Sequence, residues 1–264
     1  MRGVTVKEGK RRRGVYLIPN LLTTGNLFCG LFSILAVFNA NYVAAAIAIL
    51  VALIFDMLDG KSARLMNSTS QFGVEYDSLA DLVSFGVAPG LLIYSWALSA
   101  HGMLGSAVMF AFVACGALRL ARYNVMTTTI ESKHFTGLPI PAAASVIATM
   151  VLFDHHIVRM GAELKPLLIL IMTLVLAFLM VSTIKYRSFK DLKFRDGHHF
   201  NYLVWAILTL MLVIAWPQLM LFVVSACYAA SGVVGKGISL LARAFGRRAD
   251  PGVEPDQPVV ESKE

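Results

Sequence analysis

The sequence predicts an all-α fold, a polytopic bundle of membrane-spanning helices. Of its 264 residues, 57% are hydrophobic and only 15% are charged, and the mean hydropathy is +0.70. Soluble domains carry about a quarter charged residues. The apolar runs are continuous over about 20 residues, the length that a helix needs to cross a bilayer. They do not alternate at every second residue, as the strands of a membrane β-barrel would.

Eight apolar runs are the predicted elements, and each is long enough for one transmembrane helix. In chain order they cover residues 17–38, 41–60, 74–98, 103–125, 139–157, 166–184, 201–216 and 218–234.

Nothing in the sequence divides residues 14–234 into further domains. A basic tail over 1–13 precedes them, and a basic helix over 235–248 is predicted to lie along the membrane interface. The last segment, 249–264, is polar and contains prolines, so we expect it to be disordered.

The basic residues predict the orientation, because cytoplasmic loops of membrane proteins are rich in Lys and Arg. Of the 23 such residues, only Arg159 and Lys165 fall in an outer loop, and the other 21 lie at the opposite ends of the predicted spans. Both termini are therefore expected in the cytoplasm. The membrane is expected to be a bacterial-type cytoplasmic membrane. The net charge of +7 fits this orientation and an attraction to anionic lipids. Nucleic acid is not an expected partner.

The stretch "DMLDGKSARLMNSTSQFGVEYDSLAD" carries four aspartates in an otherwise apolar region. Asp56 and Asp59 are three residues apart, and Asp77 and Asp81 are four apart, so each pair shares one face of a helix. The connection between the two helices is short, which makes them antiparallel neighbours. All four carboxylates are therefore expected to converge at the cytoplasmic end of the bundle.

Such a cluster needs cations, because charges at membrane depth are costly and neighbouring carboxylates repel each other. The two nearby basic residues, Lys61 and Arg64, cannot balance four acids and also bind an anion. Divalent cations with oxygen ligands can do both, and two of them could hold a diphosphate during an in-line displacement. Ordinary ion pairs at a helix end are the alternative interpretation, but they do not explain the spacing.

Small residues accompany the acids. Gly60 and Ala63 leave room for a ligand on the acid-bearing face, and Gly73 allows a close approach where the next helix begins. Arg64 can bind phosphate oxygens through two parallel hydrogen bonds.

The pattern Asp-x2-Asp-Gly-x2-Ala-Arg-x8-Gly-x3-Asp-x3-Asp over residues 56–81 resembles the signature of the CDP-alcohol phosphotransferases at every fixed position. The resemblance implies a six-helix membrane core, followed here by about two further transmembrane helices, and a homodimer. It also implies two divalent cations, Mg²⁺ or Mn²⁺, and a CDP-linked donor whose phosphoryl-alcohol part moves to an acceptor hydroxyl with release of CMP.

Roles for individual residues follow from the same resemblance. It implies that Asp56, Asp59 and Asp77 bind metal, and that Asp81 is both a ligand and the base that takes the acceptor's proton. Members that use CDP-diacylglycerol often begin with a Pro-Asn-x-x-Thr like that in "IPNLLTTGN". The implied contacts of the donor are Asn20, Thr23, Gly60, Ala63, Arg64, Ser70 and Gly73. Taken by themselves, Pro19 and Thr23 could equally be a helix start and a tolerated polar residue.

Further stretches resemble the phosphatidylserine synthase branch of this family: "NLFCGLFSI" (26–34), "CGALRLARYNV" (115–125), "FTGLPIPAAA" (135–144) and "STIKYRSFK" (182–190). The implied partners are CDP-diacylglycerol, L-serine and membrane lipids. Serine carries a carboxylate that needs a cation, so Arg119, Arg122 and Asn124 are candidates for binding serine or a lipid phosphate. Their alternative role is to anchor a helix at the interface.

Two other functions stay open from the sequence. Another acceptor alcohol, such as glycerol 3-phosphate or an inositol phosphate, would need extra cations for its phosphate. A cation transporter could also place acids on two helices. It would not need the Gly60-x2-Ala63-Arg64 insert, and its acids should lie nearer the middle of the membrane.

Overall fold

The structure, a computed structural model, describes residues 17–65, 70–129, 135–158, 164–186, 211–212 and 215–246. The α-helices are α2 (Leu17–Phe38), α3 (Tyr42–Leu65), α4 (Gln71–Asp81), α5 (Ala88–Trp96), α6 (Gly102–Thr129), α7 (Ile140–Phe153), α8 (Leu164–Val181) and α10 (Pro217–Gly246). A π-helical turn, η1 (Leu82–Val87), joins α4 to α5, and a second, η3 (Asp154–Val158), extends α7. A 3₁₀ turn, η2 (Leu98–His101), precedes α6.

The predicted polytopic helical bundle is confirmed. Within the described ranges, six helices are long and apolar enough to cross a membrane: Leu17–Phe38, Tyr42–Ser62, Gln71–Trp96, Leu98–Met126, Ile140–Val158 and Pro217–Gly237. A seventh apolar helix, Lys165–Val181, is shorter. The chain is therefore an integral membrane protein. The predicted span 201–216 and the predicted tails 1–13 and 249–264 lie wholly or mostly outside the described residues.

The basic helix predicted over 235–248 falls largely within α10, which is one continuous helix from Pro217 to Gly246. Glycine weakens a helix without ending it, and this stretch contains no proline after Pro217. That the residues after 234 lie along the membrane interface stays a prediction.

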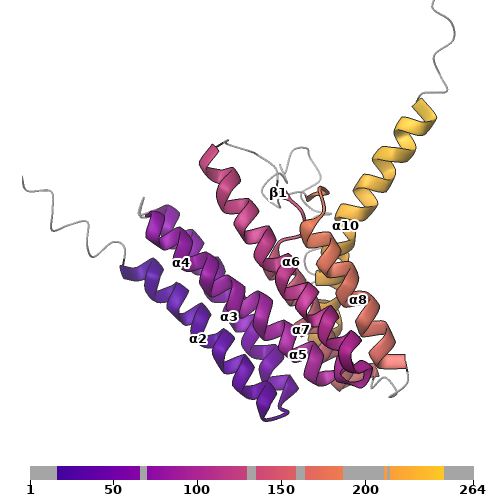
Figure 1. Ribbon diagram of the computed structural model, residues 1–264, viewed down its shortest axis with the longest axis horizontal. Helices are drawn as coiled ribbons and strands as arrows, with labels where there is room; N and C mark the ends of the chain where they lie inside the picture. The colour runs from indigo at the N-terminus through magenta and orange to yellow at the C-terminus, as the bar shows by residue number, and fades with distance from the viewer. Residues whose placement is uncertain are drawn as a thin grey trace, which may run out of the picture.

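The helices lie side by side (Figure 1), with α2 packed against both α3 and α4, α6 against α8, and α7 against α3 and α10. The start of α2, the start of α4 and the end of α6 lie at one end of the bundle, and α10 extends beyond it (Figure 1). The four aspartates sit near this end, in the last part of α3 and in α4.

A close contact joins α2 to the π-helical turn that follows Asp81. A Cβ atom on Gly30 would lie only 2.4 Å from Ser84 Oγ and 2.8 Å from Ser84 Cα. Ser84 is fully buried, and its hydroxyl donates a hydrogen bond to the backbone oxygen of Asn26 at 2.9 Å. The glycine therefore permits the approach that holds α2 against η1.

Two strands of two residues each are the exceptions to the helical fold. β1 (Phe135–Thr136) pairs antiparallel with β2 (Lys185–Tyr186), with Phe135 opposite Tyr186. Gly137 follows with a φ of +87°, and its N–H donates to the Ile184 carbonyl at 2.9 Å. A Cβ atom there would lie 2.3 Å from the Met180 carbonyl oxygen. The pairing ties the start of α7 to the end of α8.

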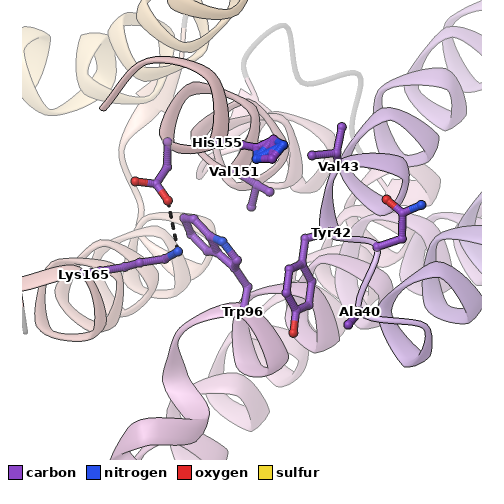
Figure 2. A pocket seen from close by; sticks show the side chains of 9 residues that line it. Ala40, Tyr42, Val43, Trp96, Val151, His155 and Lys165 are labelled. Atoms are coloured by element: carbon purple, nitrogen blue, oxygen red, sulfur yellow. Dashed lines mark ion pairs between the residues drawn. The ribbon is translucent and has the colours of Figure 1, made fainter. Parts of the chain in front are cut away.

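The other end of the bundle holds a cavity of about 580 Å³ (Figure 2). Lys165 Nζ lies 3.0 Å from Asp154 Oδ2 and 3.9 Å from the centre of the Trp96 ring (Figure 2). These contacts join α5, α7 and α8 where a Trp and a Lys are favoured at a membrane interface. Asp154 in this cavity already has Lys165 as a cationic partner, so this cavity is not the site that the acidic motif predicts.

Candidate functional site

Three carboxylates meet between α3 and α4. Asp56 and Asp59 come from α3 and Asp77 from α4, and one carboxylate oxygen of each lies within 4.8 Å of the others. Asp59 is only 4% exposed. The spacing of the two pairs thus brings three of the four acids into one group of possible metal ligands.

The donor set fits a divalent cation. Asp77 Oδ1 is buried and has no hydrogen-bond partner within the described ranges. Among those same residues, the one ion pair found is Lys165 with Asp154, at the other end of the bundle. Carboxylates this close together repel each other, and hard divalent cations prefer such oxygen ligands. The group can therefore hold a divalent metal ion.

Asp81 is buried next to this group, without belonging to it. It lines the same cavity as Asp56 and Asp77, and its Oδ1 accepts a hydrogen bond from Asn26 Nδ2 at 3.0 Å. Asn26 is fully buried on α2, where Ser84 holds its backbone oxygen. One oxygen of Asp81 is thus held by an amide on α2.

A cavity of about 370 Å³ opens beside the acids. Its walls come from α3, α4, α6, the start of α7 and α10. The lining residues are Asp56, Val74, Asp77, Ser78, Asp81, Arg119, Leu120, Tyr123, Asn124, Pro139, Pro141 and Tyr228.

The two arginines predicted for the acceptor are separated in the structure. Arg119 lines the cavity, its guanidinium lies 6.0 Å from the centre of the Tyr123 ring, and its buried Nε has no hydrogen-bond partner among the described residues. Arg122 Nη1 instead donates to the Val181 carbonyl at 3.3 Å, at the end of α8, and it is not among the cavity residues. A basic side chain at a helix C-terminus is a common cap.

Asn124 does face the cavity. Its Nδ2 donates to Ser78 Oγ at 3.0 Å and to Glu75 Oε2 at 3.4 Å, which joins α6 to α4. Arg119 and Asn124 are therefore the two predicted acceptor residues that the structure places in the cavity wall.

The residues predicted to hold the donor lie around the junction of α2, α3 and α4. Thr23 Oγ1 lies 3.0 Å from Asp59 Oδ2 and 3.1 Å from the Pro19 carbonyl oxygen, and its single proton can go to either acceptor. Ser70 caps α4 by accepting a hydrogen bond from Gly73 N at 3.0 Å. A Cβ atom on Gly73 would lie 3.6 Å from Asn20 Oδ1.

The end of α3 completes this group. Arg64 is exposed, and its Nε donates to the Gly60 carbonyl of its own helix at 2.8 Å. Among the described atoms, a Cβ atom on Gly60 would meet only Arg64 Nη2, at 3.8 Å, so they leave space beside this glycine. The side chain of Ala63 lies outside those described.

Two residues of the site were missed by sequence reasoning. Asn26 carried a usable signal, because a primary amide inside an apolar span is costly unless it is hydrogen-bonded. Tyr228 carried none, because a tyrosine in an apolar helix far along the chain gives no indication of its neighbours.

The chain is similar to known proteins over most of its length. A model of the CDP-alcohol phosphatidyltransferase family matches residues 16–184. A protein of Helicobacter pylori named CDP-diacylglycerol–serine O-phosphatidyltransferase is 39% identical over 220 residues, which cover 83% of this chain and 91% of that protein. A protein of the same name from Bacillus subtilis is 37% identical over 173 residues, covering 66% of this chain and 91% of its own length.

An archaeal relative has a related name. The archaetidylserine synthase of Methanothermobacter thermautotrophicus is 41% identical over 171 residues, which cover 64% of this chain and 69% of that protein. These names favour serine as the acceptor over glycerol 3-phosphate or an inositol phosphate, and an enzyme over a cation transporter.

Proposed function

Because the chain belongs to the CDP-alcohol phosphatidyltransferase family, we propose that it transfers the phosphatidyl group of CDP-diacylglycerol to the hydroxyl of L-serine. The products are phosphatidylserine and CMP. The observation that carries this proposal is the group formed by Asp56, Asp59 and Asp77 beside a cavity with Arg119 in its wall. The names of the relatives support serine as the acceptor.

The acids would hold two divalent cations, Mg²⁺ or Mn²⁺. Asp56, Asp59 and Asp77 supply the ligands that lie together, and Asp81 is the fourth candidate. When bound, such cations offset the charge of the diphosphate and of the leaving CMP.

The donor would lie across the junction of α2, α3 and α4, with its acyl chains in the bilayer. Asn20, Thr23, Ser70 and Gly73 surround this junction. Gly60 leaves room for the CDP moiety, and the exposed guanidinium of Arg64 can bind its phosphate oxygens. Ala63 is a donor contact by the family resemblance.

Asp81 would act as the general base. Its Oδ1 is held by Asn26 at 3.0 Å, which orients the carboxylate toward the cavity that it lines. The bond between the serine oxygen and phosphorus forms as the bond between phosphorus and the CMP oxygen breaks, and the serine proton passes to Asp81. Arg119 would bind the serine carboxylate.

The proposed orientation places both termini and the cavity on the cytoplasmic side, where the water-soluble serine and CMP are found. Most of the basic residues lie at this end of the spans. The family resemblance further implies a homodimer.

The first experiment measures CMP release by the purified protein with CDP-diacylglycerol, with and without serine and a divalent cation. We expect release to require both, and chelation of the cation to abolish it.

Asp77→Asn should lose activity at least 100-fold, since an amide replaces a charged ligand next to the reacting phosphate. Glu75→Gln, on the same helix but outside the acid group, should retain activity. Release that is equally fast with glycerol 3-phosphate, or independent of serine, would contradict the proposal.

A further inference from the structure

One wall of the cavity comes from a helix outside the matched family region. The family model ends at residue 184, but Tyr228, on α10, lines the cavity together with Asp56, Asp77, Asp81 and Arg119. α10 reaches this position by packing against α7 and β2.

The cavity lining carries charges of both signs. Asp56, Asp77 and Asp81 are its acids, and Arg119 and Tyr228 lie in the same lining. Arg119 keeps a buried Nε without a hydrogen-bond partner among the described residues, so it can bind an anion that enters the cavity.

A second tyrosine fixes the position of α10. Tyr186 is 2% exposed, and its hydroxyl donates to the Ala229 carbonyl at 3.0 Å. Burial raises the pKa of the Tyr186 phenol, with Tyr228 as a further cause, so the hydroxyl stays protonated at neutral pH and can donate.

The Tyr186 ring also meets α10 directly. A Cβ atom on Gly232 would lie 2.4 Å from Tyr186 Cζ, so the helix can approach this closely only with glycine at that position. The rings of Tyr186 and Tyr228 lie 5.9 Å apart at 44°. Because Ala229 directly follows Tyr228, the bond from Tyr186 sets where Tyr228 meets the cavity.

We propose that Tyr228 is a specificity-determining residue for the acceptor: it forms the α10 part of the cavity wall, beside Arg119, which would bind an anionic group of a small hydroxy compound. Tyr186 is the positioning residue that sets Tyr228 in this wall. The proposal rests on the proposed function of the cavity. A volume of about 370 Å³ suits a small molecule, and serine, with one hydroxyl and one carboxylate, is of this class.

The test is steady-state kinetics of CMP release. The acceptor is varied at saturating CDP-diacylglycerol, and CDP-diacylglycerol is then varied at saturating acceptor. Tyr228→Ala should raise the KM for serine about tenfold, because it removes the cavity wall beside Arg119, which would bind the serine carboxylate through a charged hydrogen bond. The KM for CDP-diacylglycerol should stay within about twofold of its wild-type value. The larger threonine, used as a rival acceptor, should gain relative to serine because the cavity is widened.

Two further variants separate specificity from stability. Phe222→Ala removes a comparable ring from the same helix, where it stacks on Phe153 at 5.0 Å and lies outside the cavity lining. It should leave the KM for serine unchanged. Tyr186→Phe removes the hydroxyl that holds Ala229, and should raise the KM for serine less than Tyr228→Ala does, without changing the KM for the donor.

The outcomes distinguish this inference from the proposed function. If the wild type releases CMP only with serine but Tyr228→Ala leaves the KM for serine and the choice of acceptor unchanged, the inference is overturned and the function stands. It is also overturned if Phe222→Ala shifts the KM for serine as much as Tyr228→Ala does. If the wild type uses a different acceptor and Tyr228→Ala raises the KM for that acceptor alone, the inference stands and serine is wrong.

Discussion

Asp81 and Asn26 form a pair of side chains whose roles depend on each other. The Asn26 amide is buried inside an apolar helix, where a polar group is stable only when hydrogen-bonded, and its Nδ2 donates to Asp81 at 3.0 Å. An amide orients a carboxylate without neutralising its charge, whereas an arginine would neutralise it. Asp81 therefore keeps its capacity to accept a proton while its rotamer is held.

We predict that Asp81→Asn abolishes turnover but retains donor binding. The amide has nearly the same shape as the carboxylate but cannot accept the serine proton, so CMP release should fall at least 100-fold. Binding of radiolabelled CDP-diacylglycerol should stay within about threefold of wild type, because the three clustered acids remain. Normal turnover in this variant would refute the assignment of Asp81 as the base.

Among the elements, the interface of α2 with the π-helical turn η1 positions the acids of α4. The turn follows Asp81 directly, and π-helical turns inside α-helices are frequent at functional sites. Ser84 on this turn holds the Asn26 carbonyl, while Gly30 allows the two backbones to approach. The arrangement connects the packing of α2 to the orientation of Asp81.

Gly30→Ala should therefore destabilise the protein. The added Cβ would meet both Oγ and the backbone Cα of Ser84, so the helices must move apart, and overpacking of this kind costs about 1–3 kcal/mol. Gly235→Ala is the matched control, because a Cβ there would meet no described atom within 4 Å. In detergent, the midpoint temperature of thermal unfolding should fall by several degrees for Gly30→Ala. For Gly235→Ala it should stay equal or rise. Equal unfolding temperatures for the two variants would argue against a close contact at Gly30.

Across the whole molecule, the two ends of the bundle differ in their chemistry. One end carries the acid group and the cavity with Arg119 in its wall. The other carries the Lys165–Asp154 pair and Trp96 (Figure 2), and Lys and Trp are residue types favoured at a membrane interface. An enzyme that joins a lipid donor to a water-soluble acceptor needs one such open end, facing the compartment that contains the acceptor.

The proposed orientation predicts the outcome of cysteine labelling in intact cells. With Cys29, Cys115 and Cys227 replaced by alanine, Met103→Cys and Leu65→Cys place single thiols at opposite ends, where the native side chains are 91% and 86% exposed. A membrane-impermeant maleimide should label Met103→Cys in intact cells. It should label Leu65→Cys only after permeabilisation. The reverse pattern would overturn the orientation.

Sequence alone determined the membrane class, the position of most spans and the identity of the acidic motif. These depend on local properties: apolar runs of a bilayer's length, the spacing of acids along one helix face, and a signature within 26 residues. The predicted span 17–38 coincides with α2 because "LIPNLLTTGNLFCGLFSILAVF" is bounded by basic residues before it and a short turn after it.

Only the tertiary structure decided which side chains share the cavity. Arg119 and Arg122 look equivalent in the sequence, but helix packing turns one toward the acids and the other toward Val181. Tyr228 joins the site from a helix more than a hundred residues away from the acidic motif. The physical reason is that the rotation and tilt of a helix are set by its contacts with other helices, and spacing along one segment does not encode them.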